Sequence, residues 1–335
     1  MASTMRMGIS SLLSLATLLL ISNTSVVLSD RCHRTDESAL LAIKASVNIR
    51  QPSWTPGTNC CNWVGVQCNN TFGRVTFVYI DPSGRSGTIP SAVGDLPFLQ
   101  TFMIRHHGGL TGQIPPAIGR LTQLTWLQLD HNSLTGPIPP SVFLLPNINY
   151  LDFTHNHLTG TIPPVIPANT PLTYLYLYNN HLTGTIPDSL GRTNIKTFYL
   201  SNNNLTGPLP ASFANAKFQL LDLSSNPLTG DASLLFGAKK PLTSLLLSRN
   251  RLDFDLTNIV FPEGLQNLDL SHNKIYGSIP KQIAQLNFDG PTSFNVSYNK
   301  LCGKIPTGGL MGQFDQFVYI QNKCLCGSPL PPCRA

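Results

Sequence analysis

The stretch LTWLQLDHNSLTGPIP, from Leu124 to Pro139, recurs along this chain in close variants. The variants are INYLDFTHNHLTGTIP from Ile148, LTYLYLYNNHLTGTIP from Leu172, IKTFYLSNNNLTGPLP from Ile195 and LQNLDLSHNKIYGSIP from Leu265. Their shared glycine returns every 23 to 26 residues, at Gly87, Gly112, Gly136, Gly160, Gly184, Gly207, Gly230, Gly277 and Gly303, with Phe254 in that slot once. Such a period is typical of a solenoid in which each repeat forms one coil, and ten repeats fit the chain.

Each repeat predicts one short strand followed by a turn. Leu127 and Leu129 alternate with Gln128, so the two leucines should point into the core and Gln128 outward. An asparagine then recurs in the bend, where its side chain can bond backbone groups that the turn leaves unpaired. Stacked coils would align these residues in an internal ladder of Asn132, Asn156, Asn180, Asn203, Asn226, Asn250, Asn273 and Asn299.

The ends of a solenoid need covers, because no coil buries its leucines alone. We expect an N-terminal cap over 30–73, the ten repeats over 74–306 and a C-terminal cap over 307–335. In the first cap, Thr35 followed by Asp36 and Glu37 predicts the start of a helix that ends near Val47. The apolar side of that helix would consist of Ala39, Leu40, Ile43 and Val47.

The eight cysteines form one group at each end of the chain, inside the expected caps. An even number in a secreted chain indicates four disulfides, and three pairings are open within each group. We expect pairing in chain order, which joins Cys32 to Cys60, Cys61 to Cys68, Cys302 to Cys324 and Cys326 to Cys333. Zinc is the competing use of clustered cysteines, but the chain has no Cys-x-x-Cys pair.

The first 29 residues have the layout of a secretory signal peptide. A basic residue, Arg6, precedes an apolar stretch from Ile9 to Ile21, and small Ser29 stands at the expected cleavage point. Polar residues interrupt that stretch, so it does not resemble a membrane span, and no later segment is apolar enough to be one. We therefore expect a secreted protein that does not span a membrane.

Charge and motifs exclude several classes of function. The formal net charge of +6 favours acidic partners such as an anionic polysaccharide, but without a block of basic residues nucleic acid is not an expected partner. Nucleotide-binding, phosphate-loop, serine-hydrolase and zinc-protease motifs do not occur in the sequence. The sequence thus predicts a binding protein and not an enzyme, with no cofactor.

Several segments resemble one family of plant proteins. Cys60, Cys61 and Trp63, followed by Gly65 to Cys68, resemble the N-terminal cap of plant leucine-rich-repeat proteins. GDASLLFG from Gly230, NKIYGSIP from Asn273, FNVSYNKLCGKIP from Phe294 and CLCGSPLPPC from Cys324 resemble, more narrowly, the polygalacturonase-inhibiting proteins.

This resemblance implies an α/β fold, a right-handed leucine-rich-repeat solenoid of about ten coils. A parallel β-sheet would line its concave face, with a second, smaller sheet after it and short 3-10 turns on the convex side. It also implies a secreted protein of the plant cell wall that covers a fungal endopolygalacturonase and blocks access of pectin to the enzyme's cleft. Direct binding of pectin, a soluble recognition or signalling role, and ice binding remain open. On the concave face, aromatic residues and Arg249 interrupt the regular polar columns that ice binding would use.

Strand alternation fixes which residues should form the concave contact face. Exposed tryptophan and tyrosine are favoured as binding anchors because they bury much area with few rotatable bonds. The expected partner-binding residues are Arg105, Trp126, Gln128, Asp130, His131, Tyr150, Asp152, His155, Tyr174, Tyr176, Tyr178, Tyr199 and Asp222. The carboxylates among them are expected to be solvated and free to meet basic residues of a partner.

Histidines and glycosylation sequons also fall on predicted surfaces. His131 and His155 should lie side by side, with His106 next along, but fewer than three converging ligands are foreseen, so no metal site is predicted. We expect exposed imidazoles that gain charge in an acidic cell wall. Sequons at Asn69, Asn204 and Asn295 are candidate glycosylation sites, and a glycan on Asn295 would obstruct part of the concave face.

Overall fold

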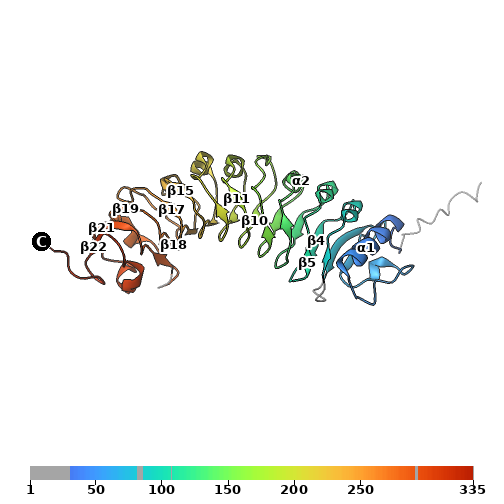
Figure 1. Cartoon of the computed structure of the whole chain (residues 1–335). Coiled ribbons are helices and arrows are strands. Elements are labelled where there is room, and N and C mark those ends of the chain that lie inside the picture. Colours follow the sequence, from blue (N-terminus) through green and yellow to red (C-terminus); the bar gives the residue numbers. More distant parts are fainter. Residues whose placement is uncertain (1–30, 81–85, 107, 291–292, 335) are drawn as a thin grey trace, which may run out of the picture.

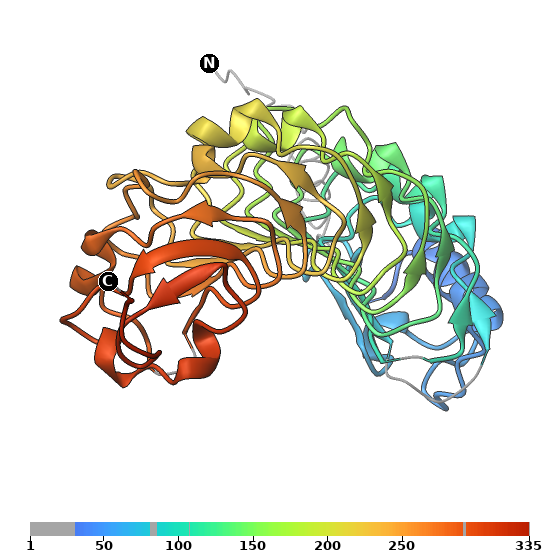
Figure 2. The ribbon, with the colours of Figure 1, turned by 60° about the vertical axis from the view of Figure 1, so that its left-hand side comes forward.

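The chain forms one row of coils that bends into an arch (Figures 1 and 2). The computed structural model describes residues 31–80, 86–106, 108–290 and 293–334. Strands of a large sheet follow the inner side of the arch, and short helical turns follow its outer rim (Figure 1). The leucine-rich-repeat solenoid expected from the sequence is therefore confirmed. The expected signal segment, 1–29, lies outside the described residues.

The large sheet contains eleven strands, in the order β1-β2-β4-β6-β8-β10-β12-β14-β16-β18-β20. Strand β1 pairs antiparallel with β2, and each later neighbour pairs parallel, one coil to the next. The strands are β1 (Val66–Cys68), β2 (Val75–Ile80), β4 (Thr101–Ile104), β6 (Trp126–Gln128), β8 (Tyr150–Asp152), β10 (Tyr174–Tyr176), β12 (Thr197–Tyr199), β14 (Leu220–Asp222), β16 (Ser244–Leu246), β18 (Asn267–Asp269) and β20 (Phe294–Asn295).

Smaller sheets follow the turn of each coil, as the resemblance implied. Four of them have two strands: β3 (Gly87–Thr88) with β5 (Leu110–Thr111), β7 (Thr135–Gly136) with β9 (His157–Leu158), β11 (Thr183–Gly184) with β13 (Asn204–Leu205), and β15 (Thr229–Gly230) with β17 (Arg251–Leu252). The fifth joins β19 (Tyr276–Gly277), β21 (Lys300–Lys304) and β22 (Cys324–Cys326).

Short helical turns occupy the remaining side of the coils. Most are 3-10 turns, and one, α2, is a single α-helical turn. They are η1 (Cys60–Asn62), η2 (Ser91–Asp95), η3 (Pro116–Arg120), α2 (Pro140–Phe143), η4 (Asp188–Arg192), η5 (Ala211–Asn215), η6 (Ser233–Leu235), η7 (Lys281–Gln285), η8 (Met311–Gln313) and η9 (Gln316–Val318). A proline precedes many of them, and η3 and α2 also begin with one, whose fixed φ suits the first helical position.

The N-terminal end is closed by helix α1 (Arg34–Val47), which begins one residue before the expected Thr35. Its N-cap is His33, whose side chain accepts a hydrogen bond from the amide of Thr35. Its apolar side, Ala39, Leu40, Ile43 and Val47, is buried as predicted.

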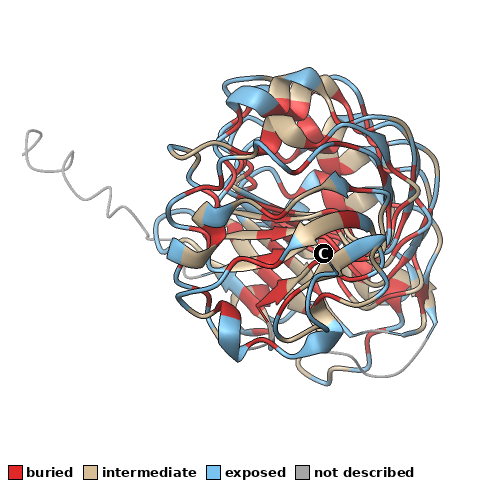
Figure 3. Ribbon diagram, turned by 90° about the vertical axis from the view of Figure 1, so that its left-hand side faces the viewer, coloured by how far each residue is buried: buried red, intermediate tan, exposed pale blue. Residues whose placement is uncertain are grey.

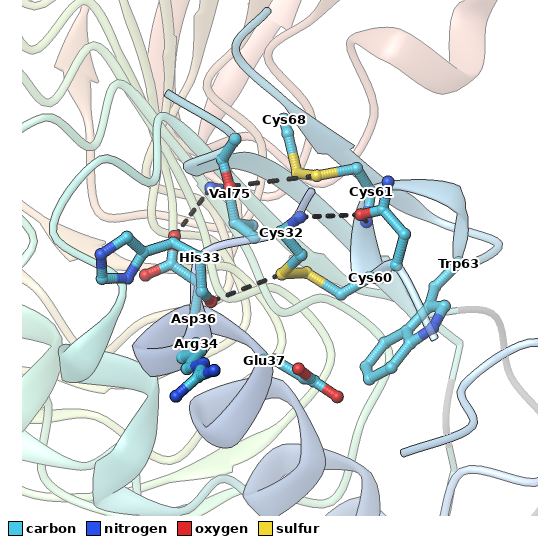
Figure 4. The surroundings of a disulfide bond; sticks show 12 residues. Cys32, His33, Arg34, Asp36, Glu37, Cys60, Cys61, Trp63, Cys68 and Val75 are labelled. Atoms are coloured by element: carbon cyan, nitrogen blue, oxygen red, sulfur yellow. Dashed lines mark hydrogen bonds between the residues drawn. A yellow bond between two sulfur atoms is a disulfide. The ribbon is translucent and has the colours of Figure 1, made fainter. Parts of the chain in front are cut away.

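Asp36, in the first turn of α1, is completely buried. It accepts hydrogen bonds from Arg74 Nε at 3.0 Å, Arg74 Nη2 at 2.8 Å and the amide of Val75 at 2.8 Å. This ion pair joins the helix to β2, the first strand of the parallel array. Disulfides Cys32–Cys60 and Cys61–Cys68 lie beside it (Figure 4).

At the C-terminal end, the segment 307–335, which was expected to form a cap, begins as one further coil of the solenoid. Asn322 adds one rung to the asparagine ladder, and β22 pairs parallel with β21. Disulfide Cys302–Cys324 links these two strands, and Cys326–Cys333 closes the last turn. All four bonds follow chain order, and no described cysteine is free.

Buried residues lie on the inner side of the coils (Figure 3), and most of them are aliphatic or aromatic. Leu127, Leu129, Leu151 and Phe153 have no exposed area, as the alternation predicts. Each fully buried leucine stabilises the fold by about 1.5–3 kcal/mol relative to an exposed one. The part of the chain that the structure describes contains no helix with the length and apolar character to cross a lipid bilayer.

The ladder asparagines tie neighbouring coils together. Asn156 Nδ2 donates to the carbonyls of Phe153 and Thr154 in its own turn and of Leu129 one coil earlier, and its Oδ1 accepts from the amide of Leu134. The same pattern recurs from Asn180 to Asn322. Because buried backbone groups are costly to leave unpaired, the ladder fixes the register in which coils stack.

Candidate functional site

Parallel pairing brings six aromatic side chains together on the inner sheet. We call Trp126, Tyr150, Tyr174, Tyr176, Tyr178 and Tyr199 the aromatic patch. Trp126, Tyr150 and Tyr174 are register partners on β6, β8 and β10, and Tyr176 pairs with Tyr199 on β12. Trp126 is 36% exposed and Tyr174 38% exposed, while the other four are partly buried. The predicted gathering of aromatic rings therefore exists on one surface.

The rings of the patch contact one another along the sheet. Trp126 and Tyr150 stack with centroids 3.6 Å apart and planes 5° apart. Tyr150 continues to Tyr176 at 5.4 Å, and Tyr176 meets Tyr199 edge-on at 5.4 Å. Stacked rings cover each other's faces, so the Trp126–Tyr150 pair offers mainly its edges to a partner. A surface of this kind suits a protein partner better than a sugar ring, which would stack on an open face.

Gln128 and Asp152 are covered by this patch, and the expectation that the Asp152 carboxylate is solvated is wrong. Gln128 is 5% exposed and Asp152 is 8% exposed. They point to the predicted side of the sheet, but long aromatic side chains on the same and neighbouring strands extend over them. Strand alternation determines which side of the sheet a residue faces, and the neighbours determine whether water reaches it.

A hydrogen-bonded network holds the patch from below. Asp152 Oδ2 accepts from Tyr150 Oη at 3.2 Å and from Gln128 Nε2 at 3.3 Å, and Asp152 Oδ1 accepts from the amide of Thr154 at 3.0 Å. Gln128 Oε1 in turn accepts from Trp126 Nε1 at 3.1 Å. Burial raises the pKa of Asp152, against the hydrogen bonds from Thr154, and also raises the pKa of Tyr150. The patch is thus ordered before any partner binds.

Asp130 is likewise buried, at 2% exposure, which again corrects the expected solvated carboxylate. Its Oδ1 accepts from Arg105 Nε at 2.9 Å, and its Oδ2 contacts His131 Nδ1 at 2.8 Å. The side chains of Arg105 and His131 are 38% and 39% exposed. In this group, Arg105 and His131 therefore meet solvent while Asp130 supports them.

Three imidazoles lie in a row along the edge of the inner sheet. His106 and His131 have ring centroids 4.5 Å apart, and His131 and His155 lie 4.1 Å apart. All three residues have positive φ, between 53° and 54°. Asn179, next along, donates to a ring nitrogen of His155. Burial, and then the neighbouring His131, lower the pKa of His155.

The second half of the inner sheet is polar and open. Asp222 Oδ1 accepts from the amide of Ser224 at 3.0 Å, and Asp269 Oδ1 accepts from the amide of Ser271 at 2.9 Å. Both aspartates are partly exposed. Asp222 is therefore the one aspartate among the expected partner-binding residues that solvent reaches.

One group at the edge of this half is absent from the expected binding set. The rings of His272 and Tyr298 stack 4.1 Å apart, and Tyr298 is 43% exposed. Burial, and then Arg249, lower the pKa of His272. His272 and Tyr298 each directly precede a ladder asparagine, as His131 and His155 do. Their position in the repeat could therefore have placed them in the binding set from the sequence.

The three sequons differ in accessibility. Asn204, on β13, is exposed. Asn69 is partly buried, and its Oδ1 accepts from the amides of Phe72 and Arg74. Asn295 is also partly buried in the inner sheet, with its Oδ1 accepting from Ser297 Oγ at 2.8 Å. Asn204 is the most favourable of the three positions for a glycan.

Family models match the N-terminal cap and several of the repeats. A leucine-rich-repeat N-terminal domain matches residues 33–69, and leucine-rich repeats match 122–182, 194–216 and 264–286. Polygalacturonase inhibitor 2 of Arabidopsis thaliana is 53% identical over 96% of this chain and 98% of its own length. The polygalacturonase inhibitor of Pyrus communis is 51% identical over 98% of this chain and 100% of its own.

The fold also matches solved structures. The crystal structure of a plant ice-binding protein superposes with a TM-score of 0.84 and 43% identity, covering 91% of this chain and 99% of that one. The ectodomain of the receptor kinase GASSHO1/SCHENGEN3 of Arabidopsis thaliana matches with a TM-score of 0.73 and 31% identity over 81% of this chain.

Proposed function

Because the chain belongs to the family of plant polygalacturonase inhibitors, we propose that it binds and inhibits a fungal endopolygalacturonase through its concave face. The observation that carries the proposal is the aromatic patch, six rings that lie together on four consecutive coils. The chain supplies no catalytic step in this function. Secretion to the plant cell wall, as part of defence, belongs to the same proposal and is supported by the four disulfides at the chain ends.

The aromatic patch has the properties of a binding anchor. Its rings are already stacked, and Gln128 and Asp152 hold Trp126 and Tyr150 by hydrogen bonds, so little rotational freedom remains to be lost on binding. Aromatic residues at the centre of an interface commonly supply most of the binding energy. Patch residues therefore carry affinity, and the half-exposed Arg105, His131 and Asp222 add directional polar contacts around them.

Inhibition follows from covering the enzyme. A curved sheet that packs against the rim of the pectin-binding cleft excludes the polymer without any contact to the catalytic groups. The inhibition should then be relieved by raising the pectin concentration, because substrate and inhibitor compete for one surface.

A purified-protein assay tests this function. Reducing ends released from polygalacturonate are measured with a panel of fungal endopolygalacturonases, at increasing concentrations of the chain and at several substrate concentrations. We expect dose-dependent, substrate-competitive inhibition of at least one fungal enzyme, with plant polygalacturonases as the comparison. An absence of inhibition across a broad panel would contradict the proposal.

Ice binding is a second candidate, favoured by one row of residues outside the concave face. Six consecutive coils carry an exposed threonine at the same position, each followed by the repeat glycine: Thr111, Thr135, Thr159, Thr183, Thr206 and Thr229. The amides of these threonines from Thr135 onward donate to the glycine carbonyl one coil earlier, which makes the row regular.

Such a row presents methyl and hydroxyl groups about 4.8 Å apart, a surface able to order water. Thermal hysteresis and recrystallisation assays test it, with Thr159→Lys and Thr183→Lys as disrupting changes. Activity that survives both substitutions, or no activity in the unmodified chain, would remove this candidate.

A further inference from the structure

We propose that the edge of the inner sheet holds a binding site for a divalent transition metal ion, with His106 and His131 as its protein ligands and Asp130 as the supporting carboxylate. Ligand atoms of these three residues lie within 4.8 Å of one another. From sequence, three converging ligands were not foreseen. Stacking of the coils brings the two imidazoles and the supporting carboxylate together, because His106 and Asp130 are separated by one full repeat.

The carboxylate fixes the orientation of the His131 ring. His131 Nδ1 lies 2.8 Å from Asp130 Oδ2, and the same carboxyl group pairs with Arg105 through its other oxygen. An ionised carboxylate only accepts hydrogen bonds, so Nδ1 of His131 is the protonated nitrogen. The lone pair for a metal is then on Nε2. Metal-binding histidines commonly donate their second nitrogen to a carboxylate in this way.

His106 provides the second imidazole on the adjoining coil. Its ring lies 4.5 Å from that of His131, with the planes tilted by 36°, and its side chain is exposed. Within the described residues, neither ring nitrogen of His106 has a hydrogen-bond partner. Both nitrogens are therefore available to a ligand.

The backbone fixes the two histidines side by side. His106 and His131 have φ of 53° and 54°, and their amides donate to the carbonyls of Asp130 and Thr154 on the next coil. Their Cα atoms are thus held in register before a metal binds. His155 stacks on the far side of His131, but its ring nitrogen accepts from Asn179, so it serves as a neighbour and not as a ligand.

The chemistry of the donors indicates which ions fit. Imidazole nitrogen is preferred by Zn²⁺, Cu²⁺ and Ni²⁺, whereas Ca²⁺ and Mg²⁺ require oxygen ligands. Two imidazoles leave the remaining coordination positions to water or to a group of a bound partner. The other cluster with suitable atoms, Cys32 with Cys60 and Cys61, offers no thiolate because its cysteines are in disulfides.

The chain contains a matched pair that lacks the carboxylate. His157 and His181 also stack on adjacent coils, with centroids 5.6 Å apart and planes 8° apart, and both are exposed. In the described part of the chain no carboxylate contacts either ring. This pair is therefore a control, because it tests whether two neighbouring surface imidazoles bind a metal without a supporting carboxylate.

The proposed ligands can be tested by substituting each histidine with glutamine. Glutamine is a suitable replacement for His106 or His131 because Gln321 occupies the equivalent position of a later coil, with φ of 57°. Isothermal titration of the untagged, chelator-treated chain with ZnCl₂ should show one saturable site. His106→Gln or His131→Gln should abolish it, and Asp130→Asn should weaken it by about 10- to 100-fold. Substituting His157→Gln together with His181→Gln should leave it unchanged. Melting temperatures of all variants verify folding.

A spectroscopic measurement identifies the ligand atom. In ¹⁵N-detected histidine NMR spectra, Zn²⁺ should shift Nε2 of His131 while Nδ1 remains protonated. Absence of Zn²⁺ and Ni²⁺ binding in the folded chain would overturn the site. So would equal loss of binding in the His157 and His181 double variant, or loss of the proton from His131 Nδ1 when the metal binds.

Discussion

Tyr150 donates a hydrogen bond from its hydroxyl group to Asp152 Oδ2, 3.2 Å away, and Asp152 is only 8% exposed. The two residues are two positions apart on β8, so they emerge on the same side of the sheet. Their contact places a titratable group beneath the aromatic patch, and its consequences can be measured.

Removing the titration of Asp152 should change how stability depends on pH. Burial raises the pKa of Asp152 in the folded chain, so the folded state binds this proton more tightly than the unfolded chain does. The resulting stabilisation is complete below the unfolded pKa of about 3.9 and is lost as pH rises through the higher folded pKa. The variant Asp152→Asn should therefore gain stability relative to the parent as pH rises from 4 to 7. Denaturant unfolding at a series of pH values measures this difference.

That variant must be produced without N-glycans, because it creates the sequon Asn-Phe-Thr. A difference in free energy that stays constant with pH would show that Asp152 does not titrate in this range.

Loss of two patch rings should weaken inhibition. The double variant Tyr174→Ala with Tyr176→Ala removes one exposed and one half-buried anchor from β10. Because anchors of this type each contribute on the order of 2 kcal/mol, inhibition should fall by more than about tenfold. Tyr276→Ala is the matched control, since Tyr276 is 45% exposed but lies on β19, outside the inner sheet. Full inhibition by the double variant would exclude the patch from the interface.

The ladder should contribute more stability than surface asparagines do. Asn180→Ala leaves the amide of Leu158 without its side-chain partner inside the coils. It also removes one of the two asparagine donors to the carbonyls of Phe153 and Leu177, which keep those of Asn156 and Asn203. An unpaired buried group costs about 1–3 kcal/mol, so a loss of that size is expected in denaturant unfolding. Asn204→Ala, at an exposed position of the next coil, should change the free energy of unfolding by less than about 0.5 kcal/mol. Similar losses in both variants would contradict this role.

A change of sequence near Asn132, the first asparagine of the ladder, should stabilise the fold. Asn132 Oδ1 is buried, and no donor among the described residues reaches it, whereas the corresponding atom of Asn156 accepts from Leu134. One coil earlier the sequence reads RHHGGLTG, with one residue more than DHNSLTG and a histidine at the asparagine position.

Replacing His107 by asparagine and deleting Gly108 restores the repeat. We expect a gain of about 0.5–1.5 kcal/mol, the net value of one hydrogen bond. Deletion of Gly108 alone is the control and should give less. A loss of stability in the combined variant would show that the longer turn is required by the fold.

Much of this architecture can be read from the repeat because its causes are local. Leu127 and Leu129 alternate with period two, and the asparagine, glycine and proline that follow each act within one turn, so the strand, bend and exit of every coil can be predicted. The grouping of cysteines at the ends likewise indicated two stapled caps, and helix α1 was misplaced by only one residue.

Exposure on the concave face could not be read in this way. Trp126, Gln128 and Asp152 all face the same side of the sheet, yet the tryptophan is open to solvent and the other two are covered. Their environments depend on side chains one coil away, about 24 residues distant in sequence, whose lengths and rotamers no single repeat specifies. The contact of His106 with His131 above the buried Asp130 arises for the same reason, since only stacked coils bring such positions within a few ångströms of each other.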